Sequence, residues 1–134
     1  MAVISTLDPA VPLLQVYDMQ RSLRFYCDVL GFQIVDRTNH DWWAMIRLGG
    51  ATLMLNTAYE DDKRPASPDP KRVRGHNDVS LYFEYSDLDA LHTHLRTKGC
   101  AVKPPAKTSD GLMQMNVKDP DGYELCFTAP LEVA

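Results

Sequence analysis

The residues of this chain whose side chains could do chemistry are few and scattered. The three cysteines, Cys27, Cys100 and Cys126, show no C-x-x-C spacing, a pattern typical of buried small hydrophobic residues. A catalytic thiol needs a neighbouring base, and the sequence places none beside them. His92 and His94 lie two positions apart in a predicted helix, about 200° around its axis, so they cannot share a metal ion.

Length, composition and charge narrow the class of protein. A chain of 134 residues with 45% hydrophobic residues is long enough for one domain with its own core. The net charge of -4 disfavours nucleic acid as a partner, and the one basic cluster, residues 71–74, predicts a solvated loop rather than an anion site. No apolar run approaches the ~18 residues that span a bilayer, and the N-terminus lacks the features of a signal peptide. We therefore expect a cytoplasmic protein with no membrane partner.

Two stretches of the chain repeat one pattern. Asp18 begins a helical stretch that ends at Gly31, and Asp87 begins another that ends at Gly99. The two aspartates are 69 positions apart and the two glycines 68, and each stretch follows an alternating apolar run. A repeated unit of this kind cannot bury its sheet face alone, so the repeat predicts two modules that pack together or on a partner.

The pattern of each unit predicts a strand, then a helix, then three further strands. In the first unit, residues 12–17 alternate and predict a strand, and the helix follows at residues 18–30. Three strands come next, at residues 32–35, 42–48 and 51–56. In the second unit, residues 79–85 predict a strand, and Ser86 with Asp89 predicts a capping box. Three strands complete it, at residues 101–103, 112–117 and 123–128.

These elements predict an α+β fold of two βαβββ modules. The modules, residues 8–58 and 78–130, would form a curved, cup-like mixed sheet with the helices on its outer face, all within a single domain. Residues 119–122 (Asp-Pro-Asp-Gly) predict a tight turn. Residues 59–77 carry three prolines and predict a connecting loop that is neither helix nor strand, either a plain crossover or a lid.

Several motifs resemble the glyoxalase/bleomycin-resistance/extradiol-dioxygenase superfamily, whose members are also called vicinal oxygen chelate proteins. The first module matches in residues 10–14, Asp18, residues 22–26 and residues 29–32, and the second in residues 87–91 and 118–123. The resemblance covers residues 9–130 and is closest to the bleomycin-resistance branch. It implies a fold more than a function, because the superfamily includes isomerases, dioxygenases and proteins that only bind.

The resemblance also bears on metal binding. Members that use a metal carry four ligands, and their motifs place those positions at Val11, Met54, Ser80 and Cys126. These side chains do not suit a hard divalent ion, so we expect no metal and no cofactor. The alternative metal site would pair His76 with Glu124.

Strand alternation divides the remaining residues between two faces. Residues that share the parity of the matched ligand positions are expected inside the cup, and the alternate ones under the helices. The adjacent Trp42 and Trp43 point to opposite faces, so one should pack in the core and the other face the cup or a partner. The alternative is that both are buried at a dimer or helix contact. The candidate ligand-binding residues are therefore Gln15, Trp42, Trp43, Asn56, Tyr82, Glu84 and Glu124. The alternative is that Gln15, Asn56 and Glu84 are polar groups at a solvated rim.

The function we predict is metal-independent binding of a small molecule, such as a drug or an aromatic metabolite, by sequestration as in antibiotic resistance. Tyr82, Glu84 and a tryptophan would select a flat, cationic ligand. Related proteins complete their cups from two chains, which implies a homodimer. The alternative is a glyoxalase-like lyase, isomerase or dioxygenase that uses a metal in the cup, or Glu84, Glu124 or Tyr82 as a general base.

Overall fold

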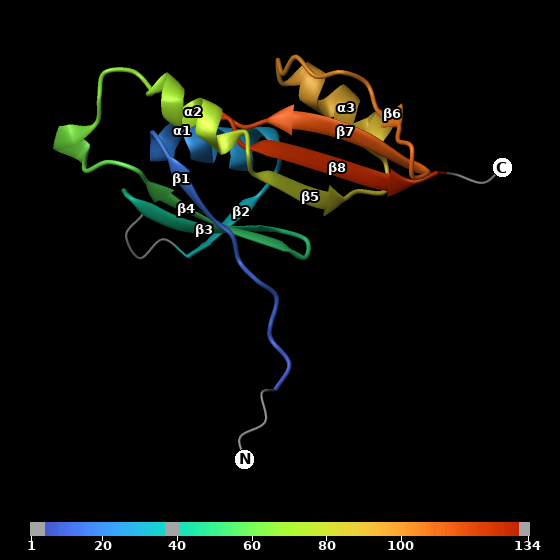
Figure 1. The fold of residues 1–134 in the computed structure, drawn as a ribbon, viewed down its shortest axis with the longest axis horizontal. Coiled ribbons are helices and arrows are strands. Elements are labelled where there is room, and N and C mark those ends of the chain that lie inside the picture. Colours follow the sequence, from blue (N-terminus) through green and yellow to red (C-terminus); the bar gives the residue numbers. More distant parts are fainter. Residues whose placement is uncertain (1–4, 37–40, 132–134) are drawn as a thin grey trace.

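The computed structural model describes residues 5–36 and 41–131, which form two four-stranded sheets (Figure 1). The first sheet has the order β1 (Leu13–Val16), β4 (Ala51–Thr57), β3 (Trp43–Leu48), β2 (Gln33–Asp36). The second has the order β5 (Ser80–Glu84), β8 (Glu124–Pro130), β7 (Leu112–Lys118), β6 (Ala106–Lys107). In each sheet one pair, β1 with β4 or β5 with β8, is parallel and the other pairs are antiparallel. The predicted α+β fold of two repeated modules is confirmed.

The helices begin where their capping residues place them. In the first module α1 (Met19–Leu23) continues as the π-helix η1 (Arg24–Val29), and in the second α3 (Leu88–Thr97) takes the same place. Asp18 caps α1 by accepting a hydrogen bond from the Arg21 backbone N–H at 3.2 Å, as predicted. The predicted capping box is wrong by one residue, because Asp87 rather than Ser86 caps α3, accepting from the Ala90 N–H at 3.0 Å.

Alternation sorts the strand residues between the two faces. Leu14 and Val16 of β1 are buried, as are Leu53 and Leu55 of β4, on the helix side of the first sheet. The second sheet repeats this arrangement in Met115, Val117, Leu125 and Phe127. Their neighbours in sequence lie on the opposite side of each sheet, which we call its open face. The open faces carry the positions that alternation predicted for the interior of the cup.

Two expectations for the connecting segments are wrong. Residues 59–77 contain a 3-10 turn, Asp61–Lys63, and a helix, α2 (Pro70–His76). Proline is compatible with a first helical turn, whose N–H groups have no partner within the helix, and the Asp69 side chain caps α2 by accepting from the Lys71 N–H at 2.9 Å. The strand predicted at residues 101–103 lies instead at β6, after Pro104 and Pro105, which have no N–H to donate to a neighbouring strand.

In the described parts of the chain, none of the helices has the length and apolar character needed to cross a membrane.

Candidate functional site

The turn at residues 119–122 holds the two modules together. Asp121 is nearly buried, with 4% of its side chain exposed, and its carboxylate reaches the start of α1 in the other module. Asp121 Oδ1 accepts from the Tyr17 backbone N–H at 2.8 Å and from Arg21 Nη2 at 3.0 Å. Asp121 Oδ2 accepts from the buried Ser22 hydroxyl at 3.3 Å. The turn therefore fixes how the first module, and with it the open face of the first sheet, is oriented against the second.

A second carboxylate of the same turn lies deeper. Asp119 Oδ2 accepts from the Tyr26 hydroxyl at 2.7 Å, and its Oδ1 accepts from the backbone N–H groups of Asp121 and Tyr123, each at 2.9 Å. Burial raises the pKa of Asp119 to about 6, although these hydrogen bonds act in the opposite direction. The Tyr123 hydroxyl accepts from the Gln15 N–H at 3.0 Å, so side chains of the second module bind the free edge of β1.

The raised pKa of Asp119 predicts a pH-dependent stability. The carboxyl titrates near 3.8 in an unfolded chain and at about 6 in the folded protein, so between these values only the folded protein holds the proton. The proton bound by Asp119 therefore stabilises the folded protein fully at pH values below 3.8. This stabilisation falls by about 3 kcal/mol as the pH rises from 3.8 to about 6. Denaturant unfolding of the parent and of Asp119→Asn from pH 4 to 7 measures the difference. Parallel pH profiles for the two proteins would contradict the assignment.

Three candidate residues form one row on the open face of the first sheet. Gln15 of β1 pairs in register with Asn56 of β4, and Asn56 pairs on its other side with Trp43 of β3. Trp42 lies just before β3, is 48% exposed and lines a hollow of about 470 Å³ together with Asn56. The expectation that one tryptophan packs in the core is wrong, because Trp43 is only half-buried on the open face and Trp42 precedes the strand.

The second sheet carries the other three candidates. Tyr82 and Glu84 of β5 line a hollow of about 330 Å³ that we call the aromatic hollow. Its wall also contains Phe32, Phe83, Tyr85 and Phe127. Glu84 is the only charged residue among the described residues that line it. Phe32 and Tyr85 were not predicted here. Both lie within the strands predicted at residues 32–35 and 79–85, and alternation gives Tyr85 the parity of Phe83, which was expected under the helices.

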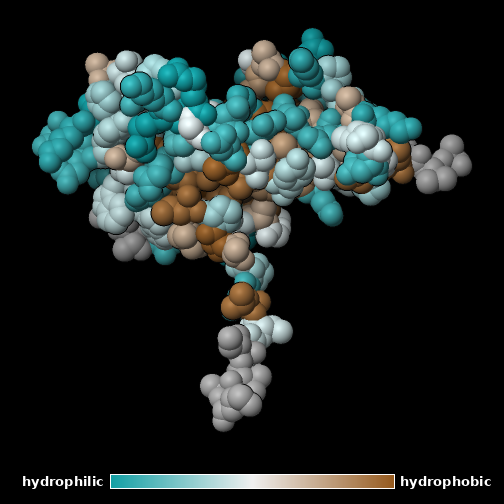
Figure 2. Space-filling view, viewed as in Figure 1, coloured by the Kyte–Doolittle hydropathy of each residue, from teal (hydrophilic) through white to brown (hydrophobic). Residues whose placement is uncertain are grey.

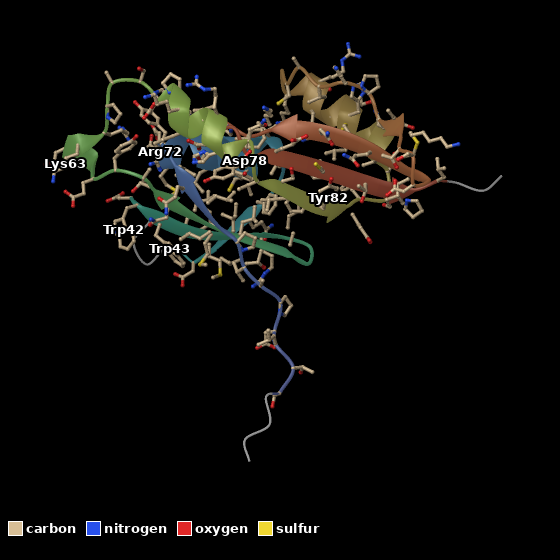
Figure 3. All side chains as sticks on the ribbon, viewed as in Figure 1. Trp42, Trp43, Lys63, Arg72, Asp78 and Tyr82 are labelled. Carbon is tan, nitrogen blue, oxygen red and sulfur yellow. The ribbon has the colours of Figure 1, made fainter. Side chains whose placement is uncertain are left out.

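Glu124 lies elsewhere on the second sheet. Its Oε1 accepts from Asn116 Nδ2 of β7 at 3.0 Å, and it lines a third hollow, of about 770 Å³. Within one chain the predicted residues therefore do not share one cleft. Figure 3 shows Trp42 and Trp43 under the first sheet and Tyr82 under β5 of the second.

Comparison with known proteins identifies the family. Residues 6–127 match the Glyoxalase/Bleomycin resistance protein/Dioxygenase superfamily, and the chain belongs to this superfamily. Among curated proteins it is similar to a bleomycin resistance protein of Geobacillus stearothermophilus, with 28% identity over 95 residues that cover 67% of this chain and 70% of the relative. It is also similar to a lactoylglutathione lyase of Schizosaccharomyces pombe, with 26% identity, 83% of this chain covered and 43% of the relative.

Solved structures share the fold. The bleomycin-binding protein of Streptomyces verticillus, solved with copper(II)-bleomycin, superposes with a TM-score of 0.69 at 24% identity, covering 96% of this chain and all of that one. A glyoxalase/bleomycin resistance protein/dioxygenase from Nocardioides gives a TM-score of 0.71 at 22% identity, covering 98% of this chain and 89% of that one.

The metal that some members of the superfamily use does not fit these side chains. Val11 and Met54 have neither an oxygen nor an imidazole donor for a hard cation, and burial raises the pKa of the Cys126 thiol, which disfavours the thiolate that binds metal. The alternative pair is not brought together. The His76 ring stacks on the Tyr123 ring, with 4.1 Å between the ring centroids, and His76 Nδ1 donates to the Asp121 carbonyl oxygen. Glu124 lies instead on the open face, where it accepts from Asn116.

Proposed function

We propose that this protein binds a flat, cationic small molecule without a metal and sequesters it in the cytoplasm. The observation that carries the proposal is the aromatic hollow, where one carboxylate, Glu84, stands among aromatic rings. Aromatic faces and a carboxylate attract a flat cation by stacking, by cation–π interaction and by charge. The net charge of -4 adds a long-range attraction for cations. Similarity to the bleomycin resistance protein and to the bleomycin-binding protein supports a binding role, and bleomycin is one candidate ligand.

We further propose that two chains complete the cleft. Leu13 on the open face of the first sheet is 46% exposed, and Tyr82 on that of the second is 66% exposed. Figure 2 shows apolar residues gathered beneath the sheets, around the point where the N-terminal segment leaves the body. Exposed apolar surface of this kind is typical of interaction sites. A homodimer would set Gln15, Trp43 and Asn56 of one chain against Tyr82 and Glu84 of the other.

The dimer is tested by light scattering on purified protein at micromolar concentration. We expect twice the mass of one chain, because pairing the open faces removes Leu13 and Tyr82 from water. A polar substitution that leaves the core untouched, Leu13→Asp, should give the monomer. A parent protein that stays monomeric over this concentration range would overturn the two-chain cleft.

The ligand site is tested with proflavine, a flat aromatic cation, and with bleomycin, both followed by tryptophan fluorescence. Glu84→Gln keeps the size of the side chain and removes its charge, so affinity should fall by about 1–3 kcal/mol if the complex buries the carboxylate. Trp42→Phe and Trp43→Phe report which ring contacts the ligand. Asp89→Asn, on the exposed side of α3, is the matched control and should leave affinity unchanged. Equal affinity in all of these variants would show that the site lies elsewhere.

An enzyme of the same superfamily is the alternative function. A general base would have to be Glu84, Glu124 or Tyr82, and the neighbouring Cys126 raises the pKa of Tyr82, which disfavours its phenolate near neutral pH. Recovery of the bound molecule unchanged, together with elemental analysis of protein purified without chelator, separates the two functions. One equivalent of metal per chain whose removal abolishes turnover would favour the enzyme.

A further inference from the structure

A large hollow opens where β7 loses its strand partner. β6 contains only Ala106 and Lys107, which pair with Gln114 and Met113 of β7. Pro104 and Pro105 precede it and have no N–H groups with which to extend this pairing. The described structure therefore leaves β7 without a strand partner on this side from Met115 to Lys118. The hollow between residues 100–108 and β7 measures about 770 Å³, and we call it the lysine hollow.

Its lining is positively charged, unlike the chain as a whole. Lys103, Lys107 and Lys118 line it, against Glu124 as the only carboxylate among the described lining residues. The Glu124 carboxylate already accepts from Asn116 Nδ2 at 3.0 Å. In the described ranges none of the three lysines forms an ion pair, and Lys118 Nζ donates only to Asn77 Oδ1, at 2.7 Å. Positive charge thus gathers here without an ion-paired carboxylate among the described residues, in a chain of net charge -4.

The rest of the lining provides an apolar wall and a polar floor. The wall is made of Ala101, Val102, Pro104 and Ala106. On the floor Gln114 Nε2 donates to Asn116 Oδ1 at 2.8 Å, which links Gln114 through Asn116 to Glu124. The volume lies within the range of about 300–1,000 Å³ that is usual for small-molecule sites.

We propose that the lysine hollow binds a small molecule with an acidic group, carboxylate or phosphate, on an apolar body. The ammonium groups of Lys103 and Lys107 neutralise the acid, and the apolar wall takes up the body of the ligand. The lysine hollow shares only Glu124 with the residues proposed above for sequestration, and it selects the opposite charge. The inference therefore does not depend on the aromatic hollow.

Four probes that share one ring system test the charge selection. They are 2-naphthoate, 2-naphthyl phosphate, the neutral 2-naphthalenemethanol and the cationic 2-naphthylmethylammonium, each titrated calorimetrically into the full chain. We expect at least one of the two acids to bind at least tenfold more tightly than the alcohol and the cation, and the better acid identifies the preferred group. Raising NaCl from 50 to 500 mM should weaken the acid severalfold and leave the alcohol unchanged. An alcohol or a cation that binds as tightly as both acids would overturn the proposal.

Four variants locate the binding. Lys103→Gln/Lys107→Gln should lower the affinity for the preferred acid at least tenfold, while Lys63→Gln/Lys71→Gln, which removes the same charge outside the hollow, should change it less than twofold. Glu124→Gln should raise the affinity severalfold, because it removes the one repelling carboxylate and keeps an acceptor for Asn116. Glu84→Gln should have no effect, which separates this site from the aromatic hollow. Equal losses in the two lysine pairs would report net charge alone and would reject the site.

Discussion

Replacing Asp121 by alanine should lower the free energy of unfolding by about 3 kcal/mol, the low end of the cost of breaking a buried ion pair, because the partner Arg21 is 30% exposed. The carboxylate accepts from the Tyr17 N–H, from Arg21 and from the Ser22 hydroxyl. Its loss leaves three donors without this acceptor, and no water is expected to reach the fully buried Ser22. Urea unfolding followed by far-UV circular dichroism measures the change.

Two further variants make the Asp121 prediction specific. Asp121→Asn keeps an acceptor oxygen and the size of the side chain but loses the charge. Its loss of stability should therefore be about 1–2 kcal/mol smaller than that of Asp121→Ala. Asp78→Ala removes an exposed carboxylate and should change stability by less than about 0.5 kcal/mol. If Asp121→Ala were as mild as Asp78→Ala, the turn would not be what holds the modules together.

The second large effect is expected at Gly122. Its φ of 90° lies in the region that side chains disfavour, and a Cβ there would lie 2.5 Å from the Val73 carbonyl oxygen of α2. A backbone atom cannot rotate away, so Gly122→Ala must push α2 from the turn or break the turn. The left-handed conformation and the overpacking together predict a loss of about 2–5 kcal/mol.

A glycine of α2 itself is the matched control. Gly75 has no atom within 4 Å of an added Cβ and lies inside the helix. Gly75→Ala should therefore stabilise the protein, by about 0.5–1 kcal/mol, because alanine favours the helix and restricts the unfolded chain. Thermal and urea unfolding of both variants give the comparison. A stable Gly122→Ala variant would mean that α2 does not pack on the turn as described.

Both substitutions also bear on binding. Asp121 holds α1 of the first module against the turn of the second, and Gly122 lets α2 approach the same turn closely. The orientation of the open faces thus depends on Asp121 and Gly122, which do not line the hollows proposed for ligands.

Local pattern in the sequence determined much of the fold. Alternation in β1 assigned Leu14 and Val16 to the helix side and Gln15 to the open face, because successive strand residues point to opposite sides. Asp18 capped α1 as predicted, because a cap involves only residues three positions apart. The motifs around residues 119–122 identified the superfamily that the comparisons confirm.

Contacts between distant residues were decided only by the tertiary structure. The sequence predicted a turn at residues 119–122, but the Asp121 carboxylate binds the Tyr17 N–H, 104 positions away. It placed Tyr82 and one of the two tryptophans in the cup without deciding which tryptophan, and the structure puts Trp43 on the open face. The lysine hollow exists because two prolines interrupt pairing to a strand that follows several residues later. Alternation and capping are set by neighbours along the chain, whereas the sites depend on which distant surfaces meet, and no short-range pattern encodes that.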